Sequence, residues 1–182
     1  MKKYILFLFL FSFLSCKKKE TKTPPPANGT YFSIVQFARD QFTSFWGQPY
    51  SFRKVVTLNG KTDSSFASVN NMDWSAVLKP FFSSDISDKK YLDQYNFSMF
   101  QDDATETRNF YYEAKDAKLF TRKLHIMADM FTDKITSIYI ETEKNGKVQK
   151  LFYAPLKLIQ IQEYESSFLG KNKDLKVEYY FM

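Results

Sequence analysis

The sequence predicts an α+β domain in which two N-terminal helices and a hairpin pack on a curved antiparallel meander of strands. Apolar residues recur at helical spacing in two segments near the start of the domain, and from residue 95 onward they alternate with polar residues, as in strands. Two Asn-Gly dipeptides, at 59–60 and 145–146, favour the positive φ angles of tight hairpin turns. In this class the helices lie on one face of the sheet.

The first helix is predicted to be capped by Thr30 or Ser33 and to end near Trp46. Residues 33–36, Ser-Ile-Val-Gln, match a capping box, in which the first and last side chains cap each other's backbone amides. Gly47 and Pro49 then act as a stop signal. The predicted apolar stripe consists of Ile34, Ala38, Phe42 and Phe45.

The second helix is predicted to begin near Asn71 or Asp73. Pro80 lies inside the helical pattern, so we expect it to kink or split this helix. The apolar positions fall at i, i+3, i+4 and i+7 and are Trp74, Val77, Leu78 and Phe81.

Two hairpins are predicted from the Asn-Gly turns. The first joins residues 52–58 to residues 61–69, and the second spans 134–154. A two-residue turn in the second sets three pairs: Lys144 with Lys147, Glu141 with Lys150, and Ile140 with Leu151. The other predicted strands cover residues 95–99, 108–114, 120–128, 157–165 and 175–181.

Aromatic residues also occupy the strand face opposite the regularly apolar one. These residues are Tyr111, Tyr139, Phe152 and Tyr180. If that face is open, they form a binding patch or line a cavity. If a helix or loop covers the face, they belong to a second layer of core. We treat the four residues as the candidate ligand or partner surface.

The first residues have the pattern of an export signal. Lys2 and Lys3 precede an apolar run of 11 residues, Tyr4–Leu14. Cys16, the only cysteine of the sequence, lies two residues after this run. The run is shorter than the roughly 20 residues of a membrane-spanning helix. This segment resembles the lipobox of bacterial lipoproteins, with Phe13 in place of the usual aliphatic residue. The resemblance implies a signal peptide at 1–15 and an acylated Cys16.

Residues 16–30 are predicted to be the anchor and a flexible Lys/Pro linker, and residues 31–182 a single domain. The 14 linker residues that follow Cys16 span up to ~45 Å when extended. Lipoproteins displayed on the cell exterior often carry acidic residues after the cysteine, whereas residues 17–19 are lysines. We therefore expect a lipid anchor in the outer membrane, with the domain facing the periplasm.

The net charge of +6 is concentrated in the leader and linker. Six of the 26 basic residues and one of the 20 acidic ones precede Ala27, so the remainder has a net charge of only +1. Nucleic-acid binding needs basic residues concentrated on the folded surface, because affinity comes largely from counterion release at phosphates. We expect no nucleic-acid partner.

Few residues suggest catalysis. His125 is the only histidine, and its alternation with Thr121 and Lys123 places it on the polar face of its strand. Residues 87–90 match a Ser-x-x-Lys pattern without its companion motifs. The acidic loop 101–106 lacks the spacing and glycine of a calcium-binding EF-hand loop. The glycines fall at turns or helix ends and form no phosphate-binding loop, so we expect no cofactor. Because there is a single histidine, no multi-histidine site can form, and we expect no metal.

A set of carboxylates keeps one enzymatic alternative open. Glu141, Glu143, Glu163 and Glu165 fall on strands that could place pairs at the separation found in glycosidases. Alternation on any sheet surface gives the same pattern.

The sequence thus predicts a non-enzymatic, membrane-anchored envelope lipoprotein that binds an envelope protein or a hydrophobic ligand in a concave pocket. A structural subunit of an outer-membrane complex is the first alternative, and a cell-wall glycan or peptide hydrolase is the second. The order of elements loosely resembles cystatin-like, NTF2-like and half-barrel folds, which implies no activity.

Overall fold

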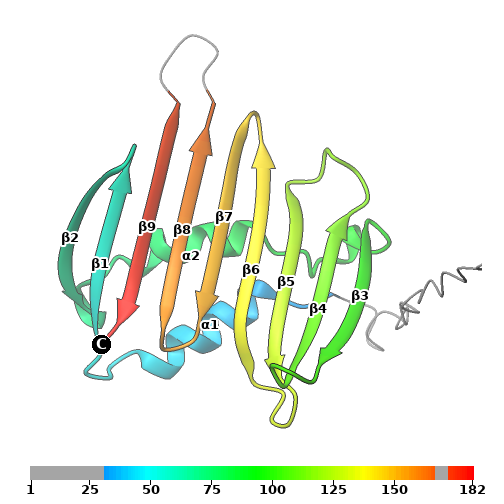
Figure 1. The fold of residues 1–182 in the computed structure, drawn as a ribbon, viewed down its shortest axis with the longest axis horizontal. Coiled ribbons are helices and arrows are strands. Elements are labelled where there is room, and N and C mark those ends of the chain that lie inside the picture. The colour runs from blue at the N-terminus through cyan, green and yellow to red at the C-terminus, as the bar shows by residue number, and fades with distance from the viewer. Residues whose placement is uncertain (1–30, 167–171) are drawn as a thin grey trace, which may run out of the picture.

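Nine strands form one antiparallel sheet within residues 31–166 and 172–182, the residues that the computed structural model describes. They lie in the order β2-β1-β9-β8-β7-β6-β5-β4-β3 (Figure 1). The bounds are β1 Ser51–Leu58, β2 Lys61–Ser68, β3 Tyr95–Asp102, β4 Thr107–Ala114, β5 Thr121–Asp129, β6 Ile135–Lys144, β7 Lys147–Ala154, β8 Leu158–Glu165 and β9 Lys173–Phe181. The two edge strands, β2 and β3, do not pair with each other, so the sheet is open. The α+β class is confirmed, and the predicted leader, anchor and linker lie outside the described residues.

Strands β3 to β9 form the predicted meander, in which each strand pairs with its neighbour in the chain. The register of the β6–β7 hairpin is the predicted one. Lys144 lies opposite Lys147 and Glu141 opposite Lys150. Asn145 has a φ of 53° and Gly146 a φ of 76°, as the tight Asn-Gly turn requires.

The β1–β2 hairpin occupies a different place from the predicted one. It does not pack on the meander but extends it, because β1 pairs along its length with β9, from Phe52 opposite Phe181 to Leu58 opposite Leu175. An unpaired edge of β9 would leave backbone donors and acceptors without partners, and β1 satisfies them. The chain thereby places its C-terminal strand inside the sheet.

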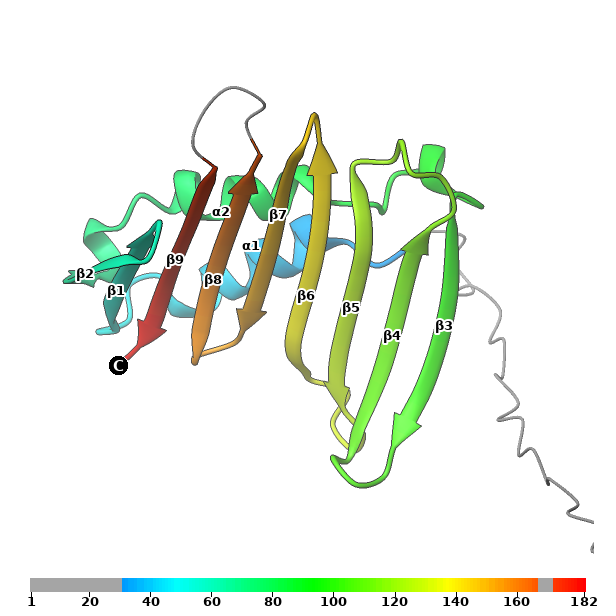
Figure 2. The ribbon, with the colours of Figure 1, turned by 45° about the horizontal axis from the view of Figure 1, so that its top comes forward.

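Two helices cover one face of the sheet. They are α1, Ile34–Phe45, and α2, Trp74–Ser83. Figures 1 and 2 both show them on the same side, behind the central strands. Two short 3-10 helices, η1 (Val69–Asn71) and η2 (Lys89–Tyr91), flank α2 in the chain. The opposite face of the sheet carries no layer of the described residues.

Only half of the predicted capping box forms at the start of α1. The Ser33 hydroxyl accepts a hydrogen bond from the backbone N–H of Gln36 at 3.2 Å. The Gln36 side chain, however, donates to Asp40 within the helix rather than returning to Ser33. Its place is taken by Asp85, which accepts from the Val35 N–H at 2.7 Å and from the Ser33 hydroxyl at 3.0 Å. A distant carboxylate therefore completes the cap.

Of the two effects predicted for Pro80, a kink or a split of α2, the split does not occur. The helix runs as one element from Trp74 to Ser83. Asp73 caps it by accepting from the Ala76 N–H at 3.0 Å. Buried Phe81 follows Pro80 and belongs to the apolar face. We infer that packing of this face on the sheet outweighs the hydrogen bond that proline removes.

Aromatic rings fill the layer between helices and sheet. The ring of Tyr153 in β7 lies 5.3 Å from Phe37 of α1 and 5.8 Å from Phe81 of α2, both in edge-to-face geometry. Trp74 is buried, and its indole N–H donates to the Val69 carbonyl at 2.8 Å. Ring pairs of this kind add to the free energy of burial.

A β-bulge in β5 changes the face assigned to one residue. The register against β6 shifts between Thr121 and Lys123. Thr121 is therefore buried on the helix side, where its hydroxyl donates to the Ser84 carbonyl at 2.9 Å. The prediction that Thr121 shares a face with His125 was wrong, because an extra residue interrupts strict alternation.

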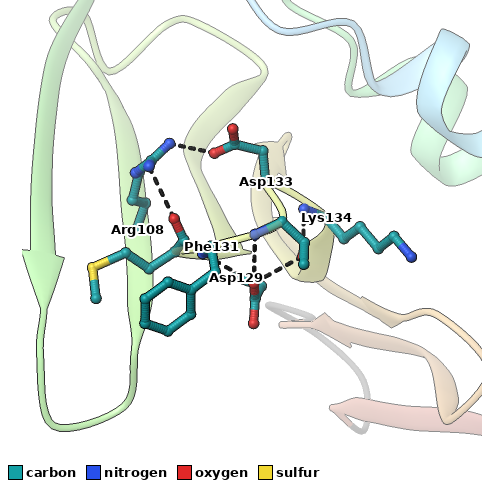
Figure 3. A network of polar contacts seen from close by, with 7 residues as sticks. Arg108, Asp129, Phe131, Asp133 and Lys134 are labelled. Carbon is teal, nitrogen blue, oxygen red and sulfur yellow. Dashed lines mark hydrogen bonds and ion pairs between the residues drawn. The ribbon is translucent and has the colours of Figure 1, made fainter.

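The β5–β6 loop is held by a polar network (Figure 3). Asp129 Oδ1 accepts from the N–H groups of Phe131 and Thr132, at 3.1 and 2.8 Å, and from the Thr132 hydroxyl. Arg108 forms an ion pair with Asp133. The Phe131 ring takes no part in these contacts and is 72% exposed. The network thus fixes a loop that presents an aromatic side chain to solvent.

Candidate functional site: an aromatic row on the open face of the sheet

Four aromatic side chains lie opposite one another on adjacent strands of the uncovered face. Tyr111 of β4 pairs with His125 of β5, His125 with Tyr139 of β6, and Tyr139 with Phe152 of β7. We call these four residues the aromatic row. Each is half-buried although no helix covers it, because its neighbours shield part of the ring. Three of the four predicted surface residues therefore come together, and His125 joins them.

Tyr180, the fourth predicted residue, lies apart from the row. It is on the same face, but its cross-strand partners are Leu158 and Arg53. The Arg53 guanidinium carbon lies 5.0 Å from the centre of the Tyr180 ring, in cation–π geometry. The Tyr180 hydroxyl donates to Glu178 at 3.1 Å. Tyr180 thus contacts residues of β1 and β9, in the half of the sheet away from the aromatic row.

One end of the aromatic row is a stack of three rings. Tyr111 and His125 are nearly parallel, with ring centroids 3.9 Å apart and an interplanar angle of 12°. Phe100 of β3 stacks on Tyr111 at 5.5 Å and 14°. Phe100 is 48% exposed, so the stack ends in an accessible apolar ring near the β3 edge. Stacking of this kind restrains all three side chains.

A hydrogen bond fixes the orientation of His125. Its Nε2 lies 2.9 Å from Asn109 Oδ1. The amide nitrogen of Asn109 donates to the Thr107 hydroxyl at 3.0 Å, which leaves the amide oxygen to accept from the histidine. Burial lowers the pKa of His125 below its usual 6.5. The imidazole is thus neutral at pH 7 and serves as a flat, hydrogen-bonded ring.

A row of charged residues runs beside the aromatic row, two positions away along β5, β6 and β7. Lys123, Glu141 and Lys150 lie opposite one another on β5, β6 and β7, and we call them the charged row. The Tyr139 hydroxyl donates to Glu141 Oε2 at 3.1 Å. Burial, and then the charge of Glu141, raises the pKa of Tyr139 to about 12. Tyr139 therefore stays protonated and links the aromatic row to the charged row.

The glutamates proposed for a hydrolase do not form the expected pairs. Glu141 and Glu143 lie on the open face of β6, because they alternate with the buried Ile140 and Thr142. Glu163 lies on the helix face, because it shares its side of β8 with Ile159 and Ile161, which contact the core. Strand β7 separates β6 from β8, and the sheet lies between Glu163 and the pair Glu141 and Glu143.

Two of these glutamates are held by cations. Glu143 pairs with Arg122 at 3.4 Å, and Glu163 pairs with Lys147 at 2.8 Å and with Lys173 at 3.3 Å. Burial alone would raise the pKa of Glu163, but its two lysine partners outweigh burial and hold the pKa below its ordinary value. A general acid needs a shift in the opposite direction.

The other chemical motifs have ordinary structural contacts. In the 87–90 segment, Lys90 pairs with Asp88 at 3.3 Å, and both side chains are exposed. In the acidic loop, Asp102 accepts a hydrogen bond from the Ala104 N–H. Within the described ranges, no three His, Cys, Asp or Glu side chains gather closely enough to hold a metal ion.

Comparison of the chain with protein-family models, with curated proteins and with solved structures finds no match. Within residues 31–166 and 172–182, no helix combines the length and the apolar character needed to cross a bilayer.

Sequence reasoning missed Phe100 and Asn109 as parts of this surface. The strand containing Phe100 was predicted to end at residue 99, whereas β3 continues to Asp102. Had alternation been followed one residue further, Phe100 would have fallen on the same face as Asn96 and Ser98. Asn109 gave no signal of its own, since only the β4–β5 register brings it next to His125.

Proposed function

We propose that the protein is a non-enzymatic envelope lipoprotein, tethered through Cys16 to the outer membrane and facing the periplasm, and that its aromatic row docks an envelope protein. The observation that carries this proposal is the position of the row. It crosses four adjacent strands, β4 to β7, on the face that neither α1 nor α2 covers.

The composition of the open face supports a protein partner. Protein interfaces are enriched in aromatic residues at the centre and have a polar rim. Here the aromatic row supplies the centre and the charged row lies directly beside it. The rings of Tyr111 and His125 are already ordered by stacking and hydrogen bonding, so less side-chain entropy is lost on binding.

A hydrophobic ligand enclosed between helices and sheet is favoured less. That layer holds fully buried side chains in mutual contact, among them Tyr153, Phe45 and Phe81. A carrier of the half-barrel, cystatin-like or NTF2-like kind would enclose its ligand in this layer. We keep that resemblance only as a curved sheet with helices on one face, which implies no activity.

A structural subunit of an outer-membrane complex would use the same face. The two functions differ in the lifetime of the complex rather than in the surface. A permanent complex would survive extraction and purification of the full chain, whereas a transient one would need crosslinking to be seen.

The proposal is tested by chemical crosslinking of the full chain in intact envelopes of its native host. Wild type is compared with a double variant of the row, Tyr139→Ser with Phe152→Ser. The matched control is Trp46→Ser with Phe131→Ser, two exposed aromatics in loops outside the row. We expect a specific protein adduct in wild type and control that is lost in the row variant. An adduct that persists in the row variant would contradict docking through this face.

A further inference from the structure

A groove lies at the end of the sheet where the β6–β7 hairpin turns, beside the C-terminal part of α2. It consists of two adjoining hollows of about 470 and 780 Å³. Both hollows are lined by Ser83, Phe120, Lys144 and Asn145. We call this the basic groove. It is separate from the aromatic row, because it lies at the strand ends and against α2.

Positive charge predominates in the lining of the basic groove. The cationic residues are Lys79, Lys118, Arg122, Lys144 and Lys147. The acidic lining residues are Glu143 and Glu165. The cations come from α2, from the β4–β5 connection and from three strands, so the fold gathers them from distant parts of the chain.

Three of the lysines have no acidic partner among the described residues. Arg122 pairs with Glu143 and Lys147 with Glu163, as described above. No carboxylate of the described chain, however, lies within ion-pair distance of Lys79, Lys118 or Lys144. Their charges therefore add up at the mouth of the basic groove, where a concave wall strengthens the field.

The hairpin tip adds a like-charge pair. Lys144 and Lys147 lie directly opposite each other across the β6–β7 turn. They share the helix side of the sheet with the buried Thr142 and Leu151, so both lie over the basic groove. Like charges in directly opposite positions destabilise a hairpin. Because Lys147 is already paired with Glu163, Lys144 is the member of this pair whose charge is available to a bound anion.

The wall of the groove also contains an unsatisfied donor. Arg122 Nε is buried and has no hydrogen-bond acceptor among the described residues, although Nη1 donates to the Asp116 carbonyl at 3.3 Å. Buried charged donors without an acceptor are costly. Neutral polar groups of Ser83 and Asn145, and the ring of Phe120, complete the lining.

We propose that the basic groove is a binding site for a ligand that carries at least two acid groups, carboxylate or phosphate. Lys118 and Lys144 provide unpaired charges for the acid groups, and Phe120 provides an apolar contact. The site is independent of docking through the aromatic row.

The test is calorimetric titration of the full chain in non-ionic detergent at low ionic strength. Tripolyphosphate is the phosphate probe and citrate is the carboxylate probe. The groove variant is Lys118→Gln with Lys144→Gln. The control is Lys123→Gln with Lys150→Gln, which removes the same charge from the exposed charged row.

We expect saturable binding of at least one probe, about tenfold weaker in the groove variant, since two close charges are lost. In the control we expect a change of less than about twofold, because its lysines do not line the groove, lie on the open face of the sheet and are screened by solvent. The tighter probe identifies the acid group. Equal weakening in both variants, or no saturable binding of either probe, would overturn the proposal. Neither result bears on crosslinking through the aromatic row.

Discussion

Tyr111 and His125 lie face to face on neighbouring strands, with ring centroids 3.9 Å apart, on a face of the sheet that neither α1 nor α2 covers. Asn109, which is itself buried and bonded to Thr107, holds the imidazole in this position. A flat, ordered aromatic surface of this kind is what a docking site needs at its centre. The lack of a second layer of helices makes it available.

Stability is expected to depend on pH through His125. Burial lowers the pKa of His125 in the folded state, so the unfolded chain binds this proton more readily. The free energy of unfolding should therefore fall as pH drops from about 6.5 through the lowered folded-state pKa, and this loss should stop below it. Because His125 is the only histidine, NMR titration of its ring measures the pKa directly. His125→Gln should remove this part of the pH dependence, and an unchanged profile would contradict the assignment.

Trp74 is predicted to be the most sensitive tryptophan. It is buried among Phe42, Phe45 and Phe52 and bonded to the Val69 carbonyl. Trp74→Ala should lower the free energy of unfolding by about 3–5 kcal/mol in denaturant titrations. Trp46, which is 53% exposed, is the control, and its replacement by Ala should cost less than about 1 kcal/mol. Equal effects would place Trp74 outside the core.

Asp85 is predicted to stabilise α1 from a distance. It accepts from the Val35 N–H and the Ser33 hydroxyl at the start of the helix. Asp85→Ala should therefore cost about 1–2 kcal/mol of stability, as the loss of an N-terminal cap does. Asp88 accepts from the Lys90 N–H at the short helix η2 and pairs with the Lys90 side chain, but both side chains are exposed, so Asp88→Ala should change stability much less than Asp85→Ala. If the two variants have the same midpoint of unfolding, Asp85 does not act as a cap.

The β5–β6 loop is predicted to lose its order without Asp129. Hydrogen bonds from Thr132, through its hydroxyl and its backbone N–H, lower the pKa of Asp129, so the carboxylate remains charged and keeps accepting. In Asp129→Ala, amide hydrogen exchange at Phe131 and Thr132 should become faster. Exchange at Asn145 and Gly146, in the other turn of β6, serves as the internal control. Unchanged protection at Phe131 would show that the Arg108–Asp133 ion pair alone orders the loop.

Cys16 is predicted to carry the membrane anchor. Cys16→Ser removes the thiol that a lipoprotein acylation requires, so the expressed chain should have its unmodified mass and should leave the membrane fraction. Intact-mass spectrometry of both forms makes this measurement. A lipid-modified mass in Cys16→Ser would contradict the prediction that Cys16 is the acylated residue.

Local signals predicted most of the secondary structure, and long-range contacts decided what was missed. The Asn145-Gly146 turn fixes the β6–β7 register through adjacent residues, so periodicity was sufficient there. The pairing of β1 with β9 joins opposite ends of the domain, and no turn specifies it. The Asp85 cap joins residues 50 positions apart, which a pattern confined to one helix does not reveal.

In the candidate site, too, local periodicity predicted some features, and others depend on long-range strand pairing. Alternation placed Tyr111, Tyr139 and Phe152 on one face, because strand periodicity is a local property. The predicted β6–β7 register also placed Tyr139 opposite Phe152. It did not place Tyr111 beside them, since that depends on the β4–β5 and β5–β6 registers. The bulge near Thr121 shows why register is hard to predict, as a single extra residue reverses the face of those before it.

The most direct test of docking through the aromatic row is site-specific photo-crosslinking in intact envelopes of the native host. A benzophenone amino acid is placed at Phe152, in the row, or at Asp40, on the exposed side of α1. The account predicts a discrete adduct with one protein from Phe152 and none from Asp40. Adducts of equal yield from both positions, or an adduct with only a small molecule of a few hundred daltons from Phe152, would contradict it.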